Sequence, residues 1–187
     1  TAVDNGETFQ LVATNTGGSP STGGTGTVND DGTGGYFAAN NNSATPSTPS
    51  GVVLDDDRVL AVSNVTVNEG SPYAVFTVTG GNNQQTTLSL AGQGGVGQTT
   101  GLTSLQYYDG ANWQNYTPGA VVSLNGTSLL VRVALSPEQE TAVDNGETFQ
   151  LVATNTGGSP STGGTGTVND DGTGGYFAAN NNSATPS

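Results

Sequence analysis

The acidic residues of this chain stand in short groups where the sequence predicts turns. Residues 55–172 contain eleven of them, and the whole chain contains no lysine. Carboxylates that converge repel one another unless a cation lies among them. Ca²⁺ takes six to eight oxygens, often from carboxylates and backbone carbonyls, and tolerates irregular loop geometry. Calcium binding is therefore one interpretation of the groups. The other is that Asp, Asn and Gly stand there only because they favour tight turns.

The eleven acids lie at the ends of the strands that the sequence predicts. Consecutive turns of an antiparallel sandwich alternate between its two ends, so several of the groups are expected to converge. The groups are Asp55, Asp56 and Asp57; Glu69; Asp109; Glu138, Glu140, Asp144 and Glu147; and Asp170 with Asp171.

The composition excludes several other kinds of chemistry. The chain has no Cys, His or Lys, which removes thiolate and imidazole metal ligands, nucleophilic triads and Schiff-base catalysis. We therefore expect no enzymatic activity. The formal net charge is -13, and the only bases are Arg58 and Arg132, which argues against nucleic acid or an anionic membrane surface as a partner. No apolar run approaches the roughly 20 residues of a membrane span.

Short runs of β-branched and aromatic residues, each bounded by Gly, Asn, Asp or Pro, predict an all-β chain. Helix formers are scarce, and Gly or Pro interrupts nearly every window. Seven or eight strands between residues 55 and 172 predict a single antiparallel sandwich. The expected strands are residues 59–67, 73–79, 86–91, 104–108, 120–124, 128–135, 148–154 and 164–168.

Alternation within two of these strands predicts the core, because every second side chain of a strand faces the same side. The expected core residues are Leu129, Val131, Val133 and Leu135 from one strand and Phe149, Leu151 and Ala153 from another. Arg132 lies on the opposite face of its strand.

Four aromatic residues have two possible roles. They form either a platform on which sugar rings stack, or the packing and corner plug that one aromatic cluster usually supplies in a sandwich. The residues are Trp113, Tyr107, Tyr108 and Tyr116.

The chain repeats itself, because residues 1–47 and residues 141–187 are identical. We expect residues 1–31 to be the C-terminal hairpin of a preceding, incomplete repeat and residues 32–54, which are rich in Asn, Ser, Thr and Pro, to be a linker. Residues 55–172 are expected to form a complete sandwich, with residues 173–187 as the start of the next linker. An isolated hairpin is marginal in water. Either the chain was cut from a tandem array without regard to domain edges, or the hairpin completes a domain of a neighbouring chain by strand exchange.

Several motifs, taken in order, resemble a known family. They are "VNEGSPYAVFTVT", "LQYYDGANWQNYTPGAVVSLNGTSLLVRVAL", "DNGETFQLVATNTG" and "GTGTVNDDGTG", which resemble the successive signatures of a Calx-beta domain. Together with "DDDRVLAVSNVTVNEGSPYAVFTVTG", they resemble the tandem extender repeats of large, calcium-dependent bacterial surface adhesins. The resemblance covers residues 55–172.

The resemblance implies an immunoglobulin-like sandwich that binds Ca²⁺ at one end. The ligands it implies are Glu69, Asp109, Glu140, Asp144, Glu147, Asp170 and Asp171. Asp55, Asp56 and Asp57 belong either to the same site or to a separate one at a domain junction. In the N-terminal copy the corresponding acids are Asp4, Glu7, Asp30 and Asp31. The family often has three consecutive acids at the end of the domain, where this chain has Asn169 before Asp170 and Asp171.

The sequence thus predicts a structural, non-catalytic module of an extracellular adhesin or surface fibre on a bacterial cell. Its partners are expected to be identical repeats in the same chain or fibre, or neighbouring chains through strand exchange. Calcium at the acidic turns is expected to keep the repeats extended and rigid. The alternative is a calcium-dependent module that binds carbohydrate or attaches to cells.

Overall fold

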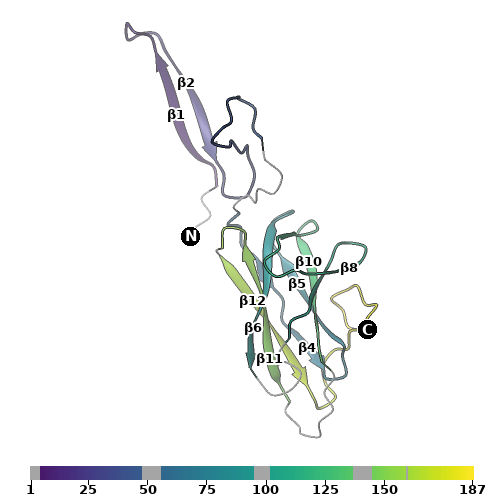
Figure 1. Cartoon of the computed structure of the whole chain (residues 1–187). Coiled ribbons are helices and arrows are strands. Elements are labelled where there is room, and N and C mark those ends of the chain that lie inside the picture. Colours follow the sequence, from purple (N-terminus) through teal and green to yellow (C-terminus); the bar gives the residue numbers. More distant parts are fainter. Residues whose placement is uncertain (1–4, 48–55, 95–101, 137–144, 159) are drawn as a thin grey trace.

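Strands are the regular secondary structure of the residues that the structure describes. The computed structural model describes residues 5–47, 56–94, 102–136, 145–158 and 160–187, and these ranges contain twelve strands and no helix. Figure 1 shows a long hairpin at one end of the molecule and a two-sheet domain at the other. The prediction of an all-β chain is confirmed.

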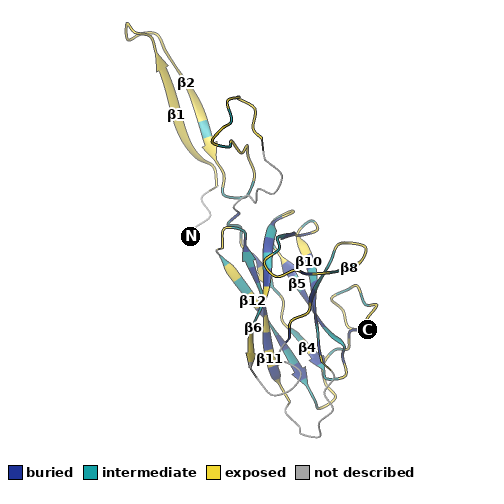
Figure 2. Ribbon diagram, in the orientation of Figure 1, coloured by how far each residue is buried: buried dark blue, intermediate teal, exposed yellow. Residues whose placement is uncertain are grey.

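The hairpin consists of β1 (Glu7–Thr14) and β2 (Ser21–Val28), which pair antiparallel along their whole length. Nearly all of its side chains are exposed, and no other strand of the described ranges joins it. Figure 2 shows the contrast between this exposed hairpin and the buried interior of the domain.

The domain consists of two five-stranded sheets. The first contains, in spatial order, β3 (Ala61–Val62), β5 (Tyr73–Thr79), β10 (Ser128–Ala134), β7 (Leu105–Tyr108) and β8 (Trp113–Asn115). The second contains β4 (Val65–Asn68), β12 (Ser161–Asn169), β11 (Glu147–Asn155), β6 (Gln85–Gly94) and β9 (Val122–Ser123). All neighbours pair antiparallel except β12 and β4, which run parallel.

The core lies between the two sheets and contains the residues that alternation predicted. All of them are buried: Leu129, Val131 and Val133 of β10, Leu135 directly after it, and Phe149, Leu151 and Ala153 of β11. Phe76 on β5 meets Phe149 edge to face, with 5.8 Å between the ring centroids. Since β5 and β11 belong to different sheets, this contact ties the two layers together.

One expected strand is divided between the sheets. Residues 59–67 form β3 in the first sheet and β4 in the second. At the crossing, Ser63 N donates to Thr77 O (2.9 Å) in the first sheet, and Asn64 Oδ1 accepts from Thr165 N (2.8 Å) in the second. Two polar residues in succession thus hold the chain to both layers, and this is why a continuous β-like run does not form one strand.

The chain enters the domain at one end, and its last strand finishes at the other. Near the start of the domain, Arg58 O accepts hydrogen bonds from Gln84 Nε2 (2.6 Å) and from Asn155 Nδ2 (2.8 Å). Asn155 is the last residue of β11, and β12 runs back antiparallel to it. We call the end that holds Arg58 and Asn155 the entry end, and the end that holds Asn169 the exit end.

Residues after β12 pack on the domain, whereas the composition predicted that a linker begins at residue 173. Phe177 is 1% exposed and its N–H donates to Ser71 Oγ (2.9 Å). Gly175 N donates to Thr66 O (2.9 Å), which continues the pairing beside β4. The polar composition suggested a linker, but the buried aromatic ring anchors this segment to the core.

Gly164 on β12 offers a matched test of packing, because Gly24 on β2 has the same sequence neighbours. A Cβ on Gly164 would collide with Ser63 O and lie 2.7 Å from Val62 Cγ1, whereas a Cβ on Gly24 would meet nothing within 4 Å. We expect G164A to destabilise the domain by about 2–3 kcal/mol, because a backbone oxygen cannot move aside easily. Urea unfolding followed by Trp113 fluorescence measures this loss. The G24A control should unfold like wild type, and equal unfolding of all three proteins would contradict this account.

Candidate functional site

Two of the expected ligands meet at the exit end because β4 and β12 run parallel. Asn68 lies opposite Asn169, and the next residue, Glu69, donates its N–H to Asn169 O (3.0 Å). Asp170 follows Asn169 directly. Glu69 and Asp170 therefore leave neighbouring strands side by side.

Glu147 begins β11 at the same end. It lies opposite Val168 of β12 and is 9% exposed. A carboxylate this deeply buried needs hydrogen bonds or a positive charge close by. The parallel pairing of β4 with β12 and the antiparallel pairing of β12 with β11 thus bring Glu69, Glu147 and Asp170 to the same end of the strands of the second sheet.

Asp171 forms hydrogen bonds at this end that connect the turn before β11 with the turn after β12. Asn145 Nδ2 donates to Asp171 Oδ2 (3.2 Å), and Asn145 Oδ1 accepts from Asp170 N (3.0 Å). Asp171 Oδ1 also accepts from the hydroxyl and the N–H of Thr173. The Thr173 side-chain bond is the main cause that lowers the pKa of Asp171. The sequence did not point to Asn145 or Thr173, although both stand beside acids in turn motifs.

Asp109 lies away from the exit end. It follows β7, which runs from the exit end toward the entry end, because Leu105 pairs with Val133 and Tyr107 with Val131. Its carboxylate accepts from Ala111 N (2.8 Å), Asn112 N (2.7 Å) and Gln114 Nε2 (2.7 Å). Asp109 thus closes the turn between β7 and β8, and it is not brought together with Glu69, Glu147 and Asp170.

The hydrogen bonds to Asp109 predict a dependence of stability on pH. The bond from Asn112 N is the first of several that lower the pKa of this carboxyl. A carboxyl whose pKa is lowered by folding stabilises the protein above its ordinary pKa of about 3.9, and that stability is lost as the pH falls through the folded value. D109N should therefore be less stable than wild type at pH 7, and the difference should shrink on acidification below about pH 4. Urea unfolding at a series of pH values measures it, and a pH-independent difference would contradict the prediction.

The acids that begin the domain form a separate group at the entry end. Asp56 is 4% exposed and accepts from Arg58 Nε (3.0 Å to Oδ1) and Nη2 (2.6 Å to Oδ2). This hydrogen bonding raises the pKa of Arg58. Asp56 and Asp57 lie at the junction with the N-terminal hairpin.

That junction is made by backbone pairing. Asp57 N donates to Asp30 O (3.0 Å), and Asp31 forms a β-bridge with Asp56. On the hairpin side, Asp31 repeats the arrangement of Asp171: it accepts from Thr33 and from Asn5 Nδ2 (3.1 Å), and these bonds lower its pKa with a smaller contribution from Arg58. Glu7 begins β1 as Glu147 begins β11, but it is exposed.

The remaining expected ligands, Asp4, Asp55, Glu140 and Asp144, lie outside the described residues, as does Glu138. Among the residues that the structure does describe, no three acidic side chains are already placed to hold a metal ion. The segment with Glu140 and Asp144 leads directly into Asn145 at the exit end.

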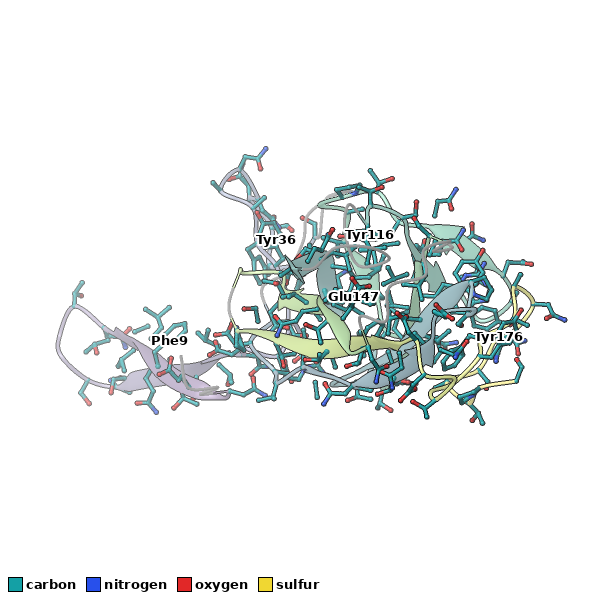
Figure 3. All side chains as sticks on the ribbon, turned by 90° about the horizontal axis from the view of Figure 1, so that it is seen from below. Phe9, Tyr36, Tyr116, Glu147 and Tyr176 are labelled. Carbon is teal, nitrogen blue, oxygen red and sulfur yellow. The ribbon has the colours of Figure 1, made fainter. Side chains whose placement is uncertain are left out.

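The aromatic residues are engaged in packing. Tyr116 is buried, and its hydroxyl accepts from Leu88 N (2.9 Å) and donates to Ala120 O (2.8 Å) (Figure 3). Trp113 Nε1 donates to Asn181 O (3.0 Å), and its ring lies 5.4 Å from that of Tyr108. These contacts match the corner-plug interpretation, since the N–H and O–H groups have partners within the domain.

Comparison with known proteins adds no family assignment. No protein-family model matches the chain, and none of the curated proteins matches it. No helix of the described ranges has the length and apolar character needed to cross a membrane.

Proposed function

We propose that this chain is a structural, non-catalytic module of a tandem array that extends a bacterial surface adhesin or fibre. The observation that carries the proposal is the position of the two ends of the domain. The backbone pairing of Asp30 and Asp31 with Asp56 and Asp57 lies at the entry end, and β12 finishes at the exit end. Domains joined in this way follow one another along a line, and Figure 1 gives the corresponding elongated outline for one junction.

The identity of the two copies supports the same proposal. The turn that contains Asp31 and Thr33 and the turn that contains Asp171 and Thr173 have the same hydrogen bonds. The exit end of the domain therefore carries the surface that, in the N-terminal copy, meets the start of the next domain. An immunoglobulin-like, Calx-beta-like identity for the sandwich belongs to this proposal, as does an extracellular location.

Calcium at the exit end is the second part of the proposal. Glu69, Glu147 and Asp170 fit such a site, because they lie at the same end of three adjacent strands and supply the oxygen ligands that Ca²⁺ requires. Glu140 and Asp144 precede Asn145 in the chain and would complete the ligand set. A bound cation would neutralise mutual repulsion of these carboxylates and so stabilise the folded end.

The calcium site predicts that the domain melts at a higher temperature when calcium is present. Extracellular modules use sites with Kd of about 10⁻⁴ M, and 10 mM calcium then stabilises the folded state by about 2.7 kcal/mol. For a domain of this size we expect Tm to rise by roughly 10 °C relative to chelator. Calorimetry of the full chain measures this, and solution scattering should give a longer maximum dimension with calcium.

The control variants separate the exit end from the other acids. E69Q with D170N should abolish the calcium-dependent rise in Tm, whereas D109N should retain it, because Asp109 lies in a different turn. Equal melting of wild type in chelator and in calcium would refute the calcium site and leave the array without its proposed cation.

A further inference from the structure

The N-terminal copy (residues 1–47) presents an apolar face that its identical C-terminal copy (residues 141–187) buries. Phe9 is 60% exposed where Phe149 is 0% exposed, and Leu11 is 76% exposed where Leu151 is 0% exposed. Figure 3 places Phe9 on the hairpin, away from the packed side chains of the domain. The sequences are the same, so the difference lies only in what covers them.

The C-terminal copy identifies the residues that cover this face. β11 pairs on one side with β6, β12 pairs with β4, and Phe149 packs against Phe76 of β5. All of these partners lie within residues 56–136. In the N-terminal copy, β1 and β2 form a two-stranded sheet whose outer edges meet no other strand of the described ranges. Open edges of this kind are templates for pairing with another chain.

The N-terminal copy already has the conformation that the docked copy has. The register from Glu7↔Val28 to Thr14↔Ser21 reproduces that from Glu147↔Val168 to Thr154↔Ser161. The Phe9 ring lies over Gly26, just as the Phe149 ring lies over Gly166. Binding would therefore cost little reorganisation, which favours affinity.

The segment after the hairpin is also preformed. Asn41 Nδ2 donates to Thr45 O (3.0 Å) as Asn181 Nδ2 donates to Thr185 O (2.9 Å), and Ser47 N donates to Tyr36 O (2.9 Å). Phe37 is 53% exposed, whereas its counterpart Phe177 is 1% exposed in the core. Residues 5–47 thus have the backbone conformation of the piece that completes the sandwich, and their apolar residues Phe9, Leu11 and Phe37 are exposed.

We propose that residues 1–47 are a donor segment that completes the sandwich formed by residues 56–136 of a second copy of this chain. The contacts would be those of the C-terminal copy, residue for residue. We call residues 56–136 the acceptor. In a chain with an intact C-terminal copy, that copy binds the acceptor of the same chain, because the attached segment has a high effective concentration. Exchange between chains therefore requires an acceptor whose own copy is absent or disabled. The inference goes beyond the extension of one chain and does not depend on calcium.

A mixing experiment tests the proposal with matched variants of the full chain. The acceptor is the tagged double variant F9D/F149D, in which neither copy can place its aromatic ring in the core, so it cannot complete itself. The donors are wild type and F9D, both of which keep an intact C-terminal copy. Acceptor and donor are refolded together in about 150 mM salt, which screens the repulsion between two acidic chains, and the tag is then captured.

We expect the tagged acceptor to retain wild type and to bind F9D about 100-fold or more weakly, because the F9D donor lacks the buried aromatic ring. Equal capture of the two donors, or capture of neither, would overturn the proposal.

A second measurement covers the case in which the acceptor is hard to refold. F149D alone keeps one competent donor, so its Trp113 fluorescence should become native as the protein concentration rises, with the mass of a dimer or larger assembly. F9D/F149D should remain unfolded at every concentration. A folded F149D monomer would show that residues 1–47 are used within one chain and would overturn the assignment to a second copy, as would identical behaviour of F149D and F9D/F149D.

Discussion

F149A is expected to remove a large share of the stability of the domain, whereas F9A should leave it unchanged. Phe149 is fully buried and meets Phe76 edge to face at 5.8 Å. Truncating such a side chain to alanine costs about 3–5 kcal/mol, because the apolar contacts are lost and a cavity remains. A domain of this size is stable by only about 5–15 kcal/mol in total. Urea unfolding followed by the fluorescence of Trp113, the one tryptophan of the chain, measures the loss.

The F9A control has the same neighbours in sequence, so intrinsic strand propensity cannot account for a difference between the two variants. Phe9 is 60% exposed, and its ring covers Gly26 of the same hairpin. If F9A lowered domain stability as much as F149A, the N-terminal copy would have to pack on the domain. If neither variant changed it, the core assignment would be wrong.

The two copies also separate what local sequence determines from what tertiary packing determines. Period-two alternation predicted that Phe149, Leu151 and Ala153 share a face, and the same alternation holds in β1. Both copies form the same hairpin in the same register. Burial, however, depends on residues 56–136, which cover only one of the copies. Sequence patterns could therefore predict strands and faces, but not which copy lies in the core.

Other features depended on contacts between residues distant in sequence. The separation of β3 from β4 rests on Ser63 and Asn64, whose partners lie in β5 and β12. β8 is only three residues long, and no alternation marks it. The meeting of Glu69 with Asp170 follows from the parallel pairing of β4 and β12, whereas an antiparallel arrangement was expected throughout. Grouping acids by turn could not distinguish Asp109 from that pair.

R132A is expected to release the C-terminal segment and to destabilise the domain by about 2–4 kcal/mol. Alternation placed Arg132 on the outer face of its strand, yet it is only 7% exposed. Its guanidinium Cζ lies 4.0 Å from the ring centroid of Tyr73 and 4.3 Å from that of Trp113. Its Nη1 donates to Ala179 O (2.8 Å). A desolvated cation–π contact contributes about 2 kcal/mol, and a hydrogen bond from a charged group about 1.5–3 kcal/mol, although the two are not additive.

Limited proteolysis with chymotrypsin separates this local release from a general loss of stability, since Phe37 of the N-terminal copy is an internal reference for Phe177 of the C-terminal copy. Phe37 is exposed and should be cleaved at the same rate in every variant, while Phe177 is buried and should be cleaved quickly only in the variants that replace Arg132. R132K should resemble R132A. The ammonium group of lysine lacks the planar guanidinium, which stacks on the two rings and donates to the carbonyl at the same time. R58A changes the other base of the chain and should leave Phe177 protected, because the Asp56–Arg58 pair lies at the entry end. Cleavage of R132A at Phe177 no faster than in wild type would mean that Phe177 and the other contacts of the segment, such as that of Trp113 Nε1 with Asn181 O, hold it without Arg132.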